Sequence, residues 1–87
     1  MIVIKDIEPK AKLHYLCIPK THFALLDEMD ETRADIVKHC FQVIPEIKDK
    51  LGLADGYRII INQGENGGQT VHHLHIHLLG GEKFQDF

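Results

Sequence analysis

One stretch near the C-terminus, VHHLHIHLLGG at residues 71–81, constrains the fold more than any other part of the chain. In a β-strand successive side chains point to opposite faces, so His73, His75 and His77 would share one face at intervals of about 6.6 Å. The apolar residues between them would lie on the other face, together with His72. A row of imidazoles over an apolar underside predicts either titratable groups that act on an anion such as phosphate, or a metal site.

Length and composition limit what this stretch can belong to. A chain of 87 residues predicts one domain over residues 1–87, with a thin core that association can supplement. The net charge is −3 and the apolar runs are short, so neither a nucleic-acid partner nor a membrane partner is expected. Cys17 and Cys40 have no CxxC spacing and no secretory signal is visible, which favours reduced core thiols in a cytoplasmic protein.

Four segments have the residue pattern of β-strands, near residues 2–5, 13–18, 57–62 and 71–79. They are rich in β-branched and aromatic residues and are bounded by proline, glycine and polar turns. The segment 13–18 is mostly apolar on both faces, which predicts a place in the middle of the sheet. The first segment starts without a preceding turn, and we interpret it as the end of a strand whose start is missing.

The middle of the chain has helical periodicity. Apolar residues recur at spacings of four, three, four and four, at Ile36, Cys40, Val43, Ile47 and Leu51. The acidic cluster at 27–31 suits a helix N-terminus, and Gly52 suits the position after its end. Pro45 predicts a kink or a break, at about 3 kcal/mol if the helix continues. Together these patterns predict an α+β fold in which a mainly antiparallel sheet of about four strands packs on one main helix.

The segment 63–69 contains three glycines and joins two predicted strands, which indicates an antiparallel hairpin. Glycine-rich loops expose main-chain N–H groups and allow an anion to approach closely. Taken alone, the loop is more simply interpreted as a flexible connection. Its position directly before the histidines favours anion binding.

These features resemble those of the histidine triad (HIT) family of nucleotide-binding proteins. The run HLHIHLL at 73–79 matches the family pattern His-φ-His-φ-His-φ-φ, where φ is hydrophobic. GGQTV at 67–71 and the glycines at 80–81 are similar to its Hint branch, the purine nucleoside phosphoramidases. Similarity extends through residues 57–64 and 13–22 to about Ile2. The resemblance implies a HIT-like fold, a homodimer formed through the helix and the strand after it, a purine nucleotide or nucleoside phosphoramidate as substrate, and no metal or other cofactor.

The resemblance also implies roles for individual residues. His75 matches the nucleophile, which attacks the α-phosphorus to give a nucleotidylated histidine that water then hydrolyses. His77 would hydrogen-bond the phosphate oxygens, and His73 would hold the His75 ring in the reactive tautomer. Thr70 occupies the position of a hydroxyl that helps the leaving group. These four residues are the predicted catalytic set.

A substrate-binding set follows from the same resemblance. It consists of Asn62, Gly68, Gln69 and Val71 at the phosphate, Asp6 and Ile7 at the ribose and base, and His14 beside the triad. For His14, a hydrogen-bonded structural histidine is an equal interpretation. His22 and His39 are interpreted as surface residues.

Relatives carry an N-terminal helix and strand that form part of the base-binding wall, and a longer C-terminal segment that reaches across the dimer. This chain lacks the N-terminal elements and ends six residues after Gly81, so we expect a shallower and weaker purine pocket. Two other functions remain open. One is a zinc-binding module that uses His73, His75 and His77, with His14 as a further ligand. The other is a nucleotide sensor that binds without turnover.

Overall fold

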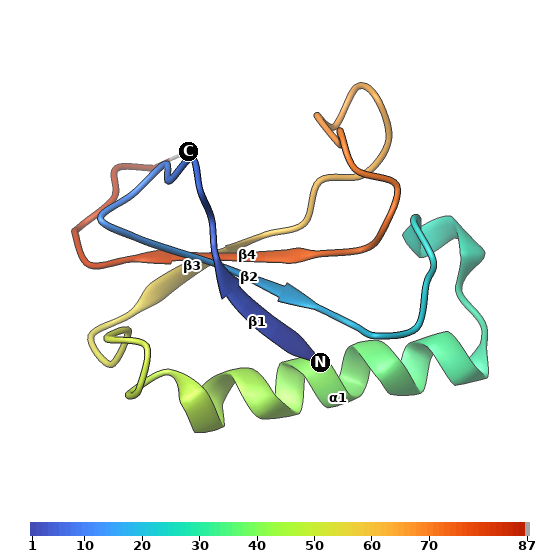
Figure 1. The fold of residues 1–87 in the computed structure, drawn as a ribbon, viewed down its shortest axis with the longest axis horizontal. Helices are drawn as coiled ribbons and strands as arrows, with labels where there is room; N and C mark the ends of the chain where they lie inside the picture. Colours follow the sequence, from blue (N-terminus) through green and yellow to red (C-terminus); the bar gives the residue numbers. More distant parts are fainter. Residues whose placement is uncertain (87) are drawn as a thin grey trace.

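The computed structural model describes residues 1–86, which form an antiparallel sheet and one main helix that lies along one face of it (Figure 1). In chain order the elements are β1 (Ile2–Lys5), β2 (Leu13–Ile18), the short 3-10 helix η1 (Leu26–Glu28), α1 (Glu31–Ile47), β3 (Tyr57–Ile60) and β4 (Ile76–Gly80). The four strands lie in the order β1-β2-β4-β3, and all neighbours are antiparallel. The predicted fold class is confirmed.

The two central strands are β2 and β4, so the predicted central place of residues 13–18 is confirmed. In their register His14 lies opposite Leu79 and Leu16 lies opposite His77. His14 and His77 are therefore diagonal neighbours on one face of the sheet, within reach of each other's long side chains. The register thus places a histidine from each central strand at the same spot.

The core lies between α1 and the sheet. Its buried residues come from both layers and from the loop after the helix: Tyr15, Cys17, Cys40, Ile44, Leu53, Ile76 and Leu78. Because side chains alternate along a strand, the residues between these core positions on β2 and β4 point away from α1. This alternation turns the histidines toward the face of the sheet that the helix does not cover.

The main helix begins at Glu31, and the side chain of Asp30 caps it by accepting the N–H of Arg33 at 2.8 Å. It continues through Pro45 and ends at Ile47, before the predicted last apolar position. Pro45 has no N–H for the preceding turn, which weakens the helix from that point. The chain then turns, and Gly52 adopts a positive φ of 78° there.

The histidine strand is shorter than the sequence predicted. β4 begins at Ile76 rather than at residue 71, so the predicted start was wrong. The reason is that β2 ends at Ile18 and is followed by Pro19, which has no N–H to pair. Upstream of β4 the N–H of Leu74 instead donates to the carbonyl of Phe23 at 2.7 Å. The end of the predicted strand 57–62 was also wrong, because β3 ends at Ile60.

The predicted alternation of faces nevertheless holds from His73 to Leu78, whereas His72, predicted on the apolar face, is exposed. Leu74, Ile76 and Leu78 are at most 1% exposed. The three histidines of the triad, His73, His75 and His77, are each partly exposed between them. Tertiary packing preserves the two-residue period even where strand pairing is absent.

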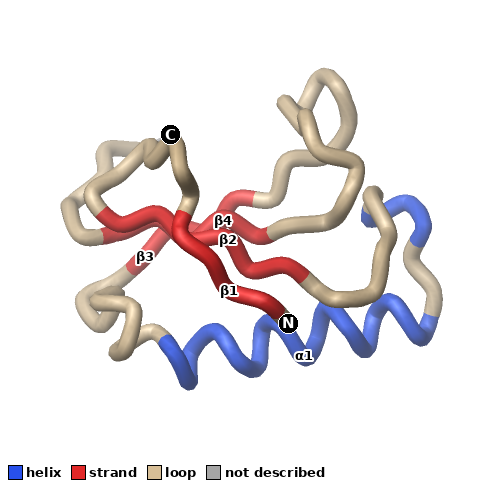
Figure 2. Tube along the Cα trace, viewed as in Figure 1, coloured by secondary structure: helices blue, strands red, loops and turns tan. Residues whose placement is uncertain are grey.

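Two long loops, 6–12 and 61–75, rise on the side of the sheet away from α1 (Figure 2). Residues of both loops line one pocket with His14 and His77. Among residues 1–86, no helix is both long and apolar enough to cross a bilayer.

Candidate active site

An open pocket of about 580 Å³ lies on the histidine face of the sheet. Eight of the predicted site residues line it: Asp6, His14, Asn62, Gly68, Thr70, Val71, His75 and His77. The other lining residues, which the sequence did not single out, are Glu8, Lys10, Leu16, Ile60 and Leu79. The fold therefore brings together residues from the loop after β1, from both central strands and from the glycine-rich loop.

Three predicted residues lie elsewhere. His73 lines an adjoining hollow of about 350 Å³ with Leu16, Ile18, Val71 and His75. Gln69 is only 8% exposed and its side chain is buried under the glycine-rich loop. Ile7 is 95% exposed and does not line either pocket. Its contact with a base stays a prediction.

The ring of His75 is fixed by one main-chain contact. Its Nδ1 lies 2.8 Å from the carbonyl oxygen of His73. A carbonyl can only accept, so Nδ1 carries the proton and donates it. In the neutral ring the other nitrogen, Nε2, then keeps its lone pair. His75 lines the pocket with the tautomer that a nucleophile requires.

His77 lies beside His75 on β4, with ring centroids 5.0 Å apart in an edge-to-face arrangement. Burial lowers the pKa of His77, His75 and His14 lower it further, and Asp6 opposes the shift. Folding thus favours the neutral imidazole. The stability that this contributes is complete above the ordinary pKa of about 6.5 and is lost as the pH falls through the lower folded pKa.

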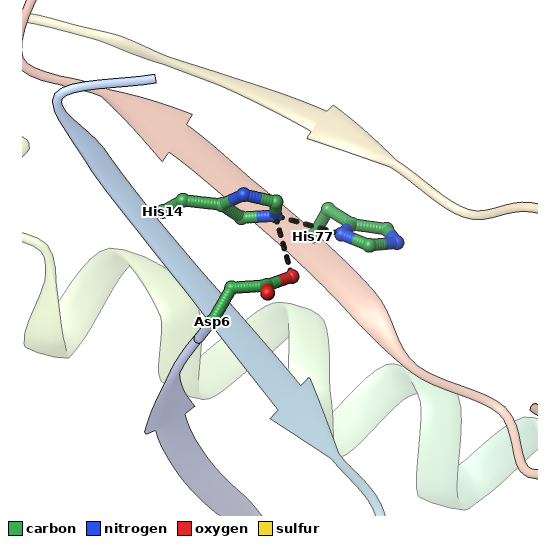
Figure 3. A group of neighbouring side chains, drawn as sticks. All are labelled: Asp6, His14 and His77. Atoms are coloured by element: carbon green, nitrogen blue, oxygen red, sulfur yellow. Dashed lines mark hydrogen bonds and ion pairs between the residues drawn. The ribbon is translucent and has the colours of Figure 1, made fainter. Parts of the chain in front are cut away.

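Asp6, His14 and His77 form a close cluster at one side of the pocket (Figure 3). His14 Nε2 lies 2.8 Å from His77 Nδ1 and 3.5 Å from Asp6 Oδ2. His14 is 5% exposed, and its Nδ1 accepts the main-chain N–H of Lys10 at 3.0 Å. His14 is therefore a buried, hydrogen-bonded histidine that contacts a residue of the triad, and a direct functional role for it stays a prediction.

The ring of His73 is held by other partners. Its Nε2 donates to the carbonyl of Pro19 at 2.7 Å, and its Nδ1 lies 3.0 Å from Nδ1 of His22. The contact between His73 and His75 comes from the His73 carbonyl rather than from its imidazole. His22 is exposed, as expected, but it also contacts His73 of the triad. No sequence pattern links His22 to His73 across 51 residues.

The glycine-rich loop is held in place by amide side chains. Gln69 Oε1 accepts the N–H of Gly64 at 2.9 Å, and its Nε2 donates to the carbonyls of Ala24 at 3.0 Å and Val71 at 3.1 Å. Asn62 Nδ2 donates to the carbonyl of Gly67 at 2.8 Å. The simpler interpretation of a flexible connection therefore does not describe this loop, whose two ends are tied to each other and to the segment before η1.

Glycine is required at two positions of this loop. A Cβ on Gly67 would press against the main chain of Gln63, which cannot move aside without opening the turn. Gly68 has a φ of 81°, a region that other residues seldom adopt. The main chain of Gly68 can therefore approach a bound anion closely at the edge of the pocket.

Replacing Gln69 with leucine is expected to destabilise the protein by about 2 kcal/mol or more, because it leaves three main-chain groups without their partner at similar side-chain volume. Urea denaturation measures this loss. Gln42 on α1 is exposed, so Gln42→Leu is the matched control and should change stability by less than about 0.5 kcal/mol. Equal effects of the two variants would show that Gln69 does not anchor the loop.

Among residues 1–86, the group whose ligating atoms are close enough to hold a metal ion is Asp6, His14 and His77, with those atoms within 4.8 Å of one another. The three triad histidines do not form such a group in this part of the chain. A metal on His14 Nε2 would require the His14 proton on Nδ1, where it would face the Lys10 N–H. Ligating histidines normally donate that proton to an acceptor. The surroundings of the cluster fit a hydrogen-bonded chain better than a metal centre.

A model of the HIT domain matches residues 1–84. The chain belongs to the HIT family. It is 44% identical over 80 residues to protein HitA of Neisseria gonorrhoeae, which covers 92% of this chain and 75% of that protein. An uncharacterized HIT-like protein of Chlamydia muridarum is 45% identical over 80 residues, and this chain spans only 64% of its length.

Solved structures of HIT proteins share the fold. The HIT family hydrolase from Clostridium thermocellum has a TM-score of 0.90 at 44% identity, covering 98% of this chain and 75% of that one. A histidine triad protein from Clostridium difficile has a TM-score of 0.89 at 38% identity, covering 98% of this chain and 75% of that one. The HIT resemblance seen in the sequence is therefore confirmed.

Proposed function

We propose that this HIT protein is a metal-independent hydrolase that cleaves purine nucleoside 5′-phosphoramidates or related nucleotidyl bonds, as the Hint-like phosphoramidases do, through a nucleotidylated His75. One observation carries the proposal. The carbonyl of His73 fixes the proton of His75 on Nδ1, which leaves the Nε2 lone pair for attack in a pocket that His77 also lines. The solved structures that this chain resembles include two described as HIT family hydrolases, which supports the assignment.

The chemistry has two displacements at phosphorus. In the first, the Nε2 lone pair of His75 forms a bond to the α-phosphorus while the bond from phosphorus to the leaving amine breaks. The amine takes up a proton from solvent as it leaves, and Thr70 is proposed to hydrogen-bond to it. In the second, water attacks phosphorus and gives up a proton to solvent while the bond to His75 breaks, which releases the 5′-nucleotide and regenerates neutral His75. His77 donates a hydrogen bond to the phosphoryl oxygens in both transition states.

The remaining lining residues are proposed to bind the substrate. The main chain from Gly68 to Val71, with Asn62 beside it, is proposed to contact the phosphate, since Gly68, Thr70, Val71 and Asn62 line one pocket. The N–H groups of Gly68 and Gln69 donate within the loop, to the carbonyls of Glu65 and Gly64 at 3.0 Å, so the N–H groups of Thr70 and Val71 are the proposed donors. Asp6 is proposed to accept the ribose hydroxyls. Ile7 is almost fully exposed, and its proposed role is contact with the base.

A homodimer is part of the proposal. The edge strand β3 exposes 38% of Ile59, and α1 exposes 41% of Phe41. Exposed apolar side chains on an edge strand and on the helix are consistent with pairing between two copies of the chain. The proposed setting is the cytoplasm, in keeping with the two free and buried cysteines.

Adenosine 5′-phosphoramidate is the direct test substrate. In the presence of a chelator, the protein is expected to release ammonia and adenosine monophosphate. Turnover that disappears with chelator and returns with zinc would favour the metal interpretation. Saturable nucleotide binding without product would favour the sensor. Either result would contradict the proposed hydrolase.

A further inference from the structure

The turn before β2 presents a main-chain donor to a buried imidazole. The N–H of Lys10 points at Nδ1 of His14, at 3.0 Å, and His14 is 5% exposed. A main-chain N–H can donate but cannot accept, and it does not release its proton at ordinary pH. Nδ1 of His14 must therefore be the acceptor. The proton of the neutral ring lies on Nε2.

Two acceptors face that Nε2–H group. His77 Nδ1 lies 2.8 Å away and Asp6 Oδ2 lies 3.5 Å away. The Asp6 carboxylate is itself held by the N–H of Glu8, which donates to Oδ1 at 2.8 Å. A carboxylate beside Nε2 adds to the preference for the protonated nitrogen. Figure 3 shows the three side chains converging on this single nitrogen.

The tautomer of His14 determines that of His77. Because His77 Nδ1 accepts from His14, the proton of neutral His77 must lie on Nε2. Figure 3 shows that Nε2 at the far side of the ring from His14. We propose that the main-chain N–H of Lys10 acts through His14 to set the tautomer of His77, which meets the substrate as a fixed Nε2–H donor, and that His14 orients His77 without carrying a proton. The inference deepens the proposed function and rests on it for its catalytic consequence.

Proton balance excludes a proton relay from His14 through His77 to the substrate. If His77 gave its Nε2 proton to the substrate and took the His14 proton at Nδ1, His14 would be left as an imidazolate. It could not recover a proton through Nδ1, which faces the Lys10 amide. An added proton on His14 Nδ1 would oppose the Lys10 N–H, and one on His77 Nδ1 would oppose the His14 Nε2–H. His14 is therefore a positioning residue.

The other charged or titratable groups that line this pocket are few. Asp6, Glu8 and Lys10 lie in the segment between β1 and β2, and His75 immediately precedes β4. Of these, only Asp6 lies within 4 Å of His14 Nε2 as an ion-pair partner. It accepts a hydrogen bond from the locked tautomer and so supports it.

Nitrogen-15 NMR of histidine-labelled protein tests the tautomers without substrate and independently of activity. In mildly alkaline solution, His14 and His77 should each show a protonated Nε2, and His75 should show a protonated Nδ1. Lys10→Pro removes the N–H and should mix the tautomers of His14 and His77. Lys10→Ala keeps the N–H and should leave them unchanged. A protonated Nδ1 on His14 in the unmodified protein would overturn the proposal.

Two substitutions of His14 test the catalytic consequence with adenosine 5′-phosphoramidate. A glutamine amide can place a donor where Nε2–H stands but cannot pass a proton along, so His14→Gln should keep kcat within about threefold of the unmodified protein. His14→Ala should lower kcat by about 10²-fold through misplacement of His77, with little change in KM. Equal losses in the two variants, with both proteins folded, would show that His14 carries a proton. If the unmodified protein lacks turnover, the proposed function fails, while the NMR result still decides the tautomer assignment.

Discussion

Replacing His75 with alanine is expected to lower kcat for adenosine 5′-phosphoramidate by more than about 10⁴-fold, because the nucleophile and its covalent step are lost together. The fold should survive, since His75 is partly exposed and its ring makes one hydrogen bond, to the carbonyl of His73. Steady-state kinetics in the presence of a chelator measure the loss. Circular dichroism checks that the variant is folded.

The neighbouring histidine provides a matched control. His72 is exposed and lies outside the pocket, so His72→Ala should keep turnover close to that of the unmodified protein. Full metal-free activity in the His75→Ala variant would rule out His75 as the nucleophile. A large loss in the His72→Ala variant would instead indicate that substitution anywhere in this stretch disturbs the site.

The second large effect is expected at His77. His77→Ala should lower kcat by about 10²–10³-fold, the usual loss when one donor to a developing oxyanion is removed. His77→Gln should recover part of this, because its amide can donate from nearly the same place as Nε2–H. KM should change little in either variant, since the contact strengthens in the transition state.

His39 is the control for this pair, because it is exposed on α1 and lies away from the active-site pocket. His39→Ala should leave both kinetic constants unchanged. A glutamine variant as slow as the alanine variant would mean that His77 must transfer a proton rather than hold a fixed hydrogen bond. That outcome would contradict the proposed role of His77 as a fixed donor.

Much of the fold could be predicted because it depends on local patterns. The two-residue period of 73–78 correctly separated histidines from core residues, and the apolar faces of 13–18 correctly indicated a central strand. Strand ends were predicted less well. β4 can begin only where β2 is available to pair with it, and β2 ends just before Pro19. Nothing within residues 71–75 shows where β2 ends.

The sequence predicted which residues form the candidate site better than it predicted the hydrogen bonds between them. Eight of the predicted residues line one pocket. They could be predicted because the histidine pattern and its flanking residues resemble those of the HIT family. The contacts that set the protons were not visible, since they use main-chain groups of Lys10, Pro19 and His73. Main-chain donors and acceptors are the same in every residue, so only the folded geometry shows which of them meets a ring.

The covalent intermediate shows whether His75 is the nucleophile. Protein mixed with excess adenosine 5′-phosphoramidate in chelator, quenched rapidly and digested, should yield one peptide that is heavier by an adenylyl group, with fragmentation placing that group on His75. The adduct should be absent from the His75→Ala variant. Steady turnover with no adduct at any quench time, or an adduct on a different histidine, would contradict the assignment of His75 as nucleophile.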